Sequence, residues 1–80
     1  MAQTFSLETL AEVAAEVIGV PTVRLTPRMS ATEVPGWDSL NHTLIILEIS
    51  NMLGIELRAD EIATLPDLGS VVDFVNERLS

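Results

Sequence analysis

The sequence predicts an all-α fold: a small four-helix bundle with three longer helices, a short third helix and a long ordered loop between the first two helices. Two observations predict it. Apolar residues recur at helical spacing in three separated segments, and a capping residue precedes each segment. Hydrophobic residues make up 48% of the 80-residue chain, enough for one mostly aliphatic core, since the aromatic residues are one Trp and two Phe. We therefore expect residues 1–80 to form a single domain.

The first predicted helix covers residues 7–18. Ser6 can cap its first turn through the side-chain hydroxyl, and Gly19 followed by Pro21 ends it. Glutamates at every fourth position on the outer face repel each other by roughly a few tenths of a kcal/mol per pair. Burial of the opposite face has to outweigh this repulsion. That apolar face consists of Leu7, Leu10, Ala11, Ala14, Val17 and Ile18.

Residues 20–37 form a long connection with three prolines and scattered apolar side chains. A disordered linker would be poorer in apolar residues. We therefore expect an ordered loop packed over the core, with one helical turn near residues 30–33. Arg24 and Arg28 are available to neighbouring acids, in ion pairs that would be exposed and weak.

The second predicted helix covers residues 39–53, with Asp38 as its N-cap and Gly54 as its stop. Its apolar residues fall on two faces. A small bundle cannot surround a helix on both sides, so we expect part of the narrower face to stay exposed as a docking surface; the alternative is that the long loop covers it. The broad core face consists of Ile45, Ile46, Ile49, Met52 and Leu53, and the narrower face, the leucine stripe, consists of Leu40, Leu44 and Leu47.

The last two predicted helices lie close together in the sequence. Asp60 is the expected N-cap of a short third helix within residues 58–65, with Ile62 pointing inward. Asp67 is the expected N-cap of the fourth helix, which covers residues 68–79. The apolar face of this fourth helix consists of Leu68, Val71, Val72, Val75 and Leu79, with Phe74 at its edge.

One stretch carries chemistry: Gly36-Trp37-Asp38-Ser39-Leu40. It places a serine in the first turn of the second helix, where unpaired backbone N–H groups favour anionic groups, above all a phosphate. This stretch resembles the signature of the acyl carrier protein family. The resemblance extends over nearly the whole chain, through Leu44, Ile45 and Ile49, then Gly54-Ile55-Glu56-Leu57, and finally Val71-Val72-Asp73-Phe74-Val75.

The resemblance implies a carrier rather than an enzyme. A separate transferase would attach 4′-phosphopantetheine from coenzyme A to Ser39, and an acyl or aminoacyl cargo would be held as a thioester on the terminal thiol of this arm. Asp38 would cap the helix and could contact a Mg²⁺ ion that bridges to the pyrophosphate oxygens during transfer. The chain has no cysteine, and we expect no resident metal site.

Two other functions compete with the carrier function. In a hydrolase, Ser39 would be the nucleophile and His42 its base. However, Asp38 is occupied as a cap, and no Gly-x-Ser-x-Gly turn or evident oxyanion hole accompanies them, so we expect His42 to be a partly buried packing residue. In an unmodified docking module of the same fold, the chain would serve only as an acidic binding surface. Acceptance of the arm by Ser39 discriminates between these functions.

The second helix departs from that of the usual fatty-acid-synthesis carriers, which display several acids to basic grooves on the synthases. The corresponding positions are Asn41, Leu44 and Ser50, and Glu48 is the only acid after the cap. We therefore expect docking with more apolar contact, through Leu40, Leu44 and Leu47. The other expected docking residues are polar: Asn41, Glu48 and Glu61.

More apolar docking favours a free-standing carrier of a specialised pathway, such as polyketide, nonribosomal peptide, modified lipid or sugar-linked acyl synthesis. A domain excised from a megasynthase is the alternative. The expected partners are a phosphopantetheinyl transferase, an acyl-loading enzyme, and a synthase or acyltransferase.

The formal net charge is −8, from 12 acidic residues against four basic ones, and it repels nucleic acids and anionic membranes. The first residues lack a basic start and an apolar run, and no segment approaches the ~18 continuous apolar residues needed to span a bilayer. We therefore expect a cytoplasmic monomer without nucleic-acid binding or membrane insertion. An acyl chain, if sequestered, is expected between the second and third helices, among Ile46, Ile49 and Ile62.

Overall fold

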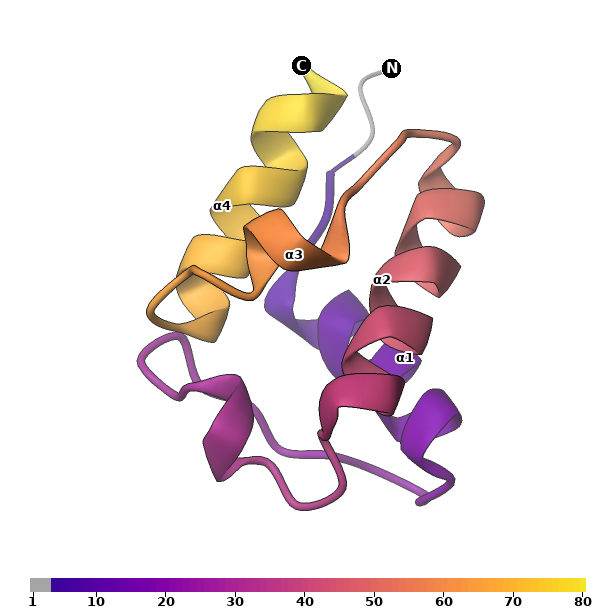
Figure 1. Cartoon of the computed structure of the whole chain (residues 1–80), viewed down its shortest axis with the longest axis vertical. Coiled ribbons are helices and arrows are strands. Elements are labelled where there is room, and N and C mark those ends of the chain that lie inside the picture. Colours follow the sequence, from indigo (N-terminus) through magenta and orange to yellow (C-terminus); the bar gives the residue numbers. More distant parts are fainter. Residues whose placement is uncertain (1–3) are drawn as a thin grey trace.

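The computed structural model describes residues 4–80, so residues 1–3 of the predicted domain lie outside the described part. Its elements are α1 (Leu7–Ile18), the 3-10 helix η1 (Ala31–Glu33), α2 (Ser39–Leu53), α3 (Ala59–Ile62) and α4 (Leu68–Leu79), and the described residues contain no strand. In Figure 1, α2 and α4 lie on opposite sides, α3 bridges them at the front, and α1 crosses behind. The predicted all-α four-helix fold is confirmed.

Side-chain caps begin the three long helices. In each helix, the side chain of the N-cap residue accepts a hydrogen bond from the backbone N–H of the residue three positions later. The distances are 3.1 Å for Ser6 and 2.8 Å for both Asp38 and Asp67. The backbone N–H and the hydroxyl of Ser70 both donate to Asp67, and these bonds lower the pKa of its carboxyl. The predicted bounds of the three long helices are therefore confirmed. None of the helices in the described part is long and apolar enough to cross a membrane.

The core is aliphatic apart from Phe5 and Trp37. Asn76 of α4 ties the start of the chain to this core, since its side chain accepts the N–H of Phe5 at 2.8 Å and donates to the carbonyl of Phe5 at 2.9 Å. Each of the four α-helices contributes to one continuous cluster. Its buried members are Phe5, Leu10, Val13, Ala14, Val34, Trp37, Ile45, Ile46, Ile49, Ile62, Leu68, Val71 and Val75.

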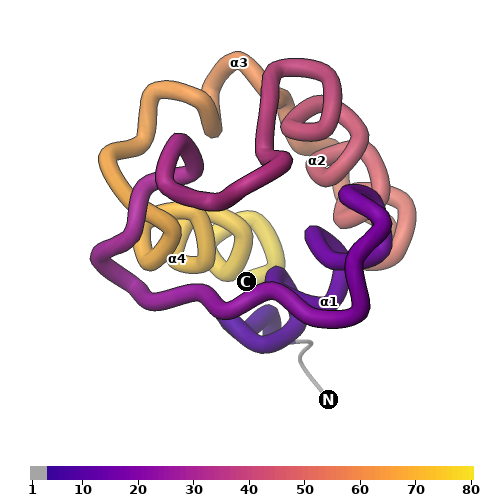
Figure 2. The backbone as a smooth tube through the Cα atoms, turned by 90° about the horizontal axis from the view of Figure 1, so that it is seen from below, coloured from indigo at the N-terminus to yellow at the C-terminus, as the bar shows by residue number. Residues whose placement is uncertain are grey.

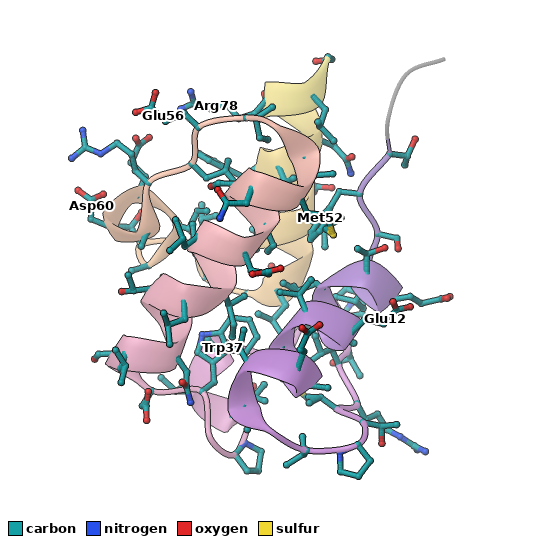
Figure 3. All side chains as sticks on the ribbon, turned by 90° about the vertical axis from the view of Figure 1, so that its right-hand side faces the viewer. Glu12, Trp37, Met52, Glu56, Asp60 and Arg78 are labelled. Carbon is teal, nitrogen blue, oxygen red and sulfur yellow. The ribbon has the colours of Figure 1, made fainter. Side chains whose placement is uncertain are left out.

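The core differs from the predicted faces at two places. Met52 is 47% exposed, so its expected core position is wrong. Met52 belongs to the last turn of α2, and Figure 3 shows it near the C-terminal end of that helix, above α1 in the view. In α1, Val13 and Ala15 are buried although the predicted face omitted them, because α1 packs against both α2 and α4 and so buries a wider arc.

Residues 20–37 form the predicted ordered loop, which closes the lower end of the bundle (Figures 1 and 2). Val34 of this loop is buried in the core. The N–H of Leu68 donates to the carbonyl of Met29 at 2.8 Å, and that of Gly69 donates to the carbonyl of Pro27 at 2.9 Å. These bonds fasten the loop to the first turn of α4. The predicted helical turn near residues 30–33 is η1.

The start of α3 corrects the prediction for Asp60. The helix begins at Ala59, and Arg58 occupies the N-cap position. The Asp60 carboxylate accepts a hydrogen bond from the Arg58 guanidinium at 3.0 Å, which lowers the pKa of Asp60 and raises that of Arg58. Both side chains are exposed, so the pair adds little stability. Among the described residues, Arg24 and Arg28 do not form the ion pairs expected for them.

Gly36 turns the chain from the loop into α2, with φ of +88°, and a Cβ there would lie 2.6 Å from Cγ2 of Ile18. We expect Gly36→Ala to lower the free energy of unfolding by about 1–3 kcal/mol more than Gly54→Ala does. Gly54 is the matched control because its φ is also positive, at +68°, while an added Cβ has no neighbour within 4 Å. Urea denaturation of both variants measures the difference, and equal losses would show that the contact with Ile18 does not matter.

Candidate functional site

Ser39 is the first residue of α2, and its side chain is exposed. The turn before it is held by the side-chain amide of Asn41, which donates to the carbonyl of Gly36 at 2.8 Å. No residue in the described range accepts the backbone N–H of Ser39 or Leu40. Free N–H groups at the positive end of a helix dipole stabilise a bound anion. The site therefore presents a reachable hydroxyl beside a position that suits a phosphate group.

Asp38 is adjacent to this hydroxyl, and its Oδ1 atom caps α2. Residues 4–80 hold no group of three or more His, Cys, Asp or Glu side chains that could bind a metal ion. Mg²⁺ commonly takes one or two protein carboxylates and completes its shell with water and substrate phosphates. With only the Asp38 carboxylate available, the site suits a Mg²⁺ ion that binds while a substrate supplies phosphate oxygens as further ligands.

His42 lies one turn into α2, is half-buried, and has both ring nitrogens engaged. Trp37 Nε1–H donates to its Nδ1 at 3.1 Å, and its Nε2 lies 3.0 Å from the carbonyl oxygen of Ala59. A carbonyl oxygen can only accept, so in this arrangement Nε2–H is the donor to Ala59 and Nδ1 is the acceptor from Trp37. Because neither nitrogen is free to take a proton from Ser39, the arrangement does not support the hydrolase. The expected partial burial of His42 is confirmed.

An open cleft of about 610 Å³ lies where α2, α3 and η1 meet. Ser39 and His42 both belong to its lining, and the other side chains there are mostly small. The sequence did not predict this cleft, because its walls come from three segments that are distant in the chain. The lining consists of Ala31, Thr32, Trp37, Asp38, Ser39, His42, Thr43, Ala59, Asp60 and Ala63.

The leucine stripe is exposed, as expected. The exposed fractions are 69% for Leu40, 41% for Leu44 and 54% for Leu47, so the long loop does not cover it. The stripe begins at the residue after Ser39 and continues along α2. Glu48, the next residue after the stripe, is also exposed.

The two remaining expected docking residues have partners inside the chain. Asn41 is half-buried and bonds to the turn at Gly36. Glu61 lies on α3, with its carboxylate 3.5 Å from the Arg78 guanidinium and 3.8 Å from that of Arg58. The side chains of Asn41 and Glu61 are therefore held by polar contacts within the chain, whereas the leucine side chains of the stripe are exposed to solvent.

Comparisons with known proteins agree with this architecture. Residues 8–75 match the family described as "Phosphopantetheine attachment site". The chain is 32% identical over 66 residues to an acyl carrier protein of Acidothermus cellulolyticus, a match that covers 82% of this chain and 79% of that protein. It is 28% identical over 71 residues to an acyl carrier protein of Thermobifida fusca, which covers 89% and 90% of the two chains. An acyl carrier protein of Thermosynechococcus vestitus is 26% identical over 80 residues, with 100% and 99% covered. No solved structure matches significantly.

A helical bundle that presents an exposed serine at the start of its second long helix has the architecture of a carrier domain. The family match extends over most of the chain, and the chain belongs to the acyl carrier protein family. It is therefore a carrier of acyl groups and not an enzyme, and its cofactor is 4′-phosphopantetheine. The exposed hydroxyl of Ser39, the free N–H groups beside it and the adjoining cleft fit this group.

Proposed function

We propose that Ser39 is the residue that bears 4′-phosphopantetheine, and that the chain presents an acyl or aminoacyl intermediate to partner enzymes. The observation that carries this proposal is the exposed Ser39 hydroxyl at the first position of α2, beside two backbone N–H groups without acceptors in residues 4–80. A phosphodiester on Ser39 would lie at the positive end of the helix dipole. When bound, the arm supplies a terminal thiol that holds the cargo as a thioester.

In the attachment reaction, Ser39 Oγ attacks the pantetheine-bearing phosphorus of coenzyme A. One Ser39 O–P bond forms, the P–O bond of the pyrophosphate breaks, and adenosine 3′,5′-bisphosphate leaves. A base on the transferase takes the hydroxyl proton, since both nitrogens of His42 are engaged. During transfer, the Asp38 carboxylate would be the protein ligand of a Mg²⁺ ion, which would offset the negative charge of the pyrophosphate.

The leucine stripe and its acidic neighbours are the proposed docking surface for partner enzymes. Exposure of Leu40, Leu44 and Leu47 next to Ser39 supports this assignment, because an enzyme that reaches Ser39 also meets the stripe. Asn41 shapes the turn, while Glu48 and Glu61 supply the polar rim. The partners are a phosphopantetheinyl transferase, an acyl-loading enzyme and a synthase or acyltransferase. The apolar stripe favours a specialised pathway, in which the chain acts as a cytoplasmic monomer.

The test is the intact-protein mass after incubation with coenzyme A, Mg²⁺ and a broad-specificity phosphopantetheinyl transferase. We expect one phosphopantetheine on the wild type, none on Ser39→Ala, and one on Ser50→Ala. Ser50 is the matched control, since it is a serine of the same helix whose hydroxyl bonds to the carbonyl of Ile46 at 2.9 Å. Absence of the addition across several transferases, with all three proteins folded, would favour the unmodified docking module.

A further inference from the structure

A chain of two hydrogen bonds joins the loop, α2 and α3 at one point. Trp37 Nε1–H donates to Nδ1 of His42, and Nε2–H of His42 donates to the carbonyl of Ala59, at 3.1 and 3.0 Å. The rings of Trp37 and His42 are also close, with centroids 6.3 Å apart. Trp37 is only 8% exposed, so if its hydrogen bond to His42 were broken, water could not easily take the place of His42 as acceptor. We call these three residues the Trp37–His42–Ala59 bridge.

The bridge lies across the seam between α2 and α3. Ile46 is one turn further along the same face of α2, and Ile62 is three residues beyond Ala59 in α3. Both isoleucines are buried, with 1% and 2% exposed surface. A chain attached at Ser39 therefore has to pass His42 and Ala59 before it can reach the core between these helices. The cleft next to Ser39 lies on the outer side, and its lining includes His42 and Ala59 but neither isoleucine.

We propose that the Trp37–His42–Ala59 bridge keeps this seam closed, so that the arm and its cargo lie in the surface cleft and a long aliphatic chain does not enter the core. The proposal rests on the proposed function, since it assumes that the arm is attached at Ser39. His42 is then a specificity-determining residue, and the cargo class that the chain holds best is a short or polar acyl or aminoacyl group. The sequestration expected from the sequence, among Ile46, Ile49 and Ile62, is replaced by retention at the surface.

The chemistry of the cleft agrees with such a cargo. Its lining includes the small apolar side chains of Ala31, Ala59 and Ala63 and the hydroxyl-bearing side chains of Thr32 and Thr43. A surface that mixes small apolar groups with hydrogen-bonding groups suits an arm built from methylene and amide units and a short polar end group. A long alkyl chain would leave most of its length in water there, because the cleft is open.

The test compares acyl chains of two lengths on the same protein. A phosphopantetheinyl transferase loads the wild type with the arm from acetyl-coenzyme A or dodecanoyl-coenzyme A, and intact mass confirms each product. We expect the two forms to melt at the same temperature and to show the same methyl chemical shifts for Ile46, Ile49 and Ile62. A dodecanoyl form that melts higher and shifts these methyl signals in the wild type would overturn the proposal.

Variants of His42 separate the bridge from general packing. His42→Ala removes both bonds, so we expect its dodecanoyl form to melt above its acetyl form, by roughly 4 °C or more, and to shift the isoleucine methyls. The glutamine side chain has an acceptor (the amide oxygen) and a donor (the amide nitrogen) on the same carbon, just as the two nitrogens of imidazole share a carbon. We therefore expect His42→Gln to behave like the wild type. Asn51→Ala, which removes an exposed polar side chain on the opposite side of α2 from His42, serves as the control. If His42→Ala also shows no chain-length effect, the bridge does not close the seam.

A second route keeps this test independent of the carrier function. The chain has no cysteine, so Ser39→Cys creates a single thiol at the site. Methyl and dodecyl methanethiosulfonate then attach alkylthio groups of two lengths: the thiolate of the Ser39→Cys variant attacks the alkyl-bearing sulfur, a disulfide bond forms, and methanesulfinate leaves. The same melting and methyl-shift measurements apply, with and without His42→Ala. If only the transferase reaction fails, the proposed function is wrong and the closed seam is untouched. If the dodecyl form of the Ser39→Cys variant melts higher than the methyl form and shifts the isoleucine methyl signals, the chain has entered the core and the seam is not closed.

Discussion

Leu10→Ala is expected to lower the free energy of unfolding by about 3–5 kcal/mol, because it leaves a cavity at a fully buried position. Leu10 has no exposed surface and lies in α1, which packs against both α2 and α4. A domain of this length has a total stability of about 4–12 kcal/mol. The variant should therefore lie close to the limit of folding, and its melting temperature should fall by about 4–8 °C per kcal/mol lost.

Leu47→Ala is the matched control, since it removes the same atoms from the middle of a helix at a position that is 54% exposed. We expect a change within about 0.5 kcal/mol, because few contacts are lost and alanine has the higher helix propensity. Urea denaturation, followed by far-UV circular dichroism and by the fluorescence of Trp37, measures both variants and tests whether the two probes coincide. A loss at Leu47 comparable to that at Leu10 would contradict an exposed leucine stripe.

Local signals explain why the helix bounds could be predicted. Ser6, Asp38 and Asp67 each accept the N–H three residues on, and Gly19 and Gly54 adopt positive φ at the ends of α1 and α2. These bonds span only a few residues, so residue type and spacing determine them. The exposure of the leucine stripe could be predicted for a related reason: the apolar surface of α2 exceeds what its neighbours α1 and α3 can cover.

A competing local contact and long-range geometry explain what the sequence could not show. Asp60 satisfies the local rule for an N-cap, but the exposed Arg58 guanidinium binds its carboxylate, and the helix begins at Ala59, two residues before the start that this cap would give. Met52 satisfies the helical period of the core face, but it lies in the last turn of α2 and is 47% exposed. The partner of His42 at Ala59 is 17 residues away, and no spacing rule connects them. The same limit applies to the cleft, whose walls meet only in the folded chain.

Leu40→Glu is expected to lower kcat/KM for transfer of the arm to Ser39 by about 10–100-fold, the effect of losing one central apolar contact in an interface. Leu40 is adjacent to Ser39 and, at 69% exposed, projects further into solvent than the other leucines of the stripe. A buried carboxylate at that contact would have no partner and would be costly to desolvate. The loss should appear mainly in KM, because the Ser39 hydroxyl itself is unchanged.

Impaired folding cannot account for this loss, because a negative charge in the first turn of α2 interacts favourably with the helix dipole. Far-UV circular dichroism and the melting temperature of the Leu40→Glu variant check this. Val20→Glu is the control, since it adds the same charge at another exposed apolar residue, 41% exposed and located after α1. An unchanged kcat/KM for Leu40→Glu would remove the stripe from the docking surface. An increase would indicate a basic groove on the transferase, and the acids near α2 rather than its leucines would then direct docking.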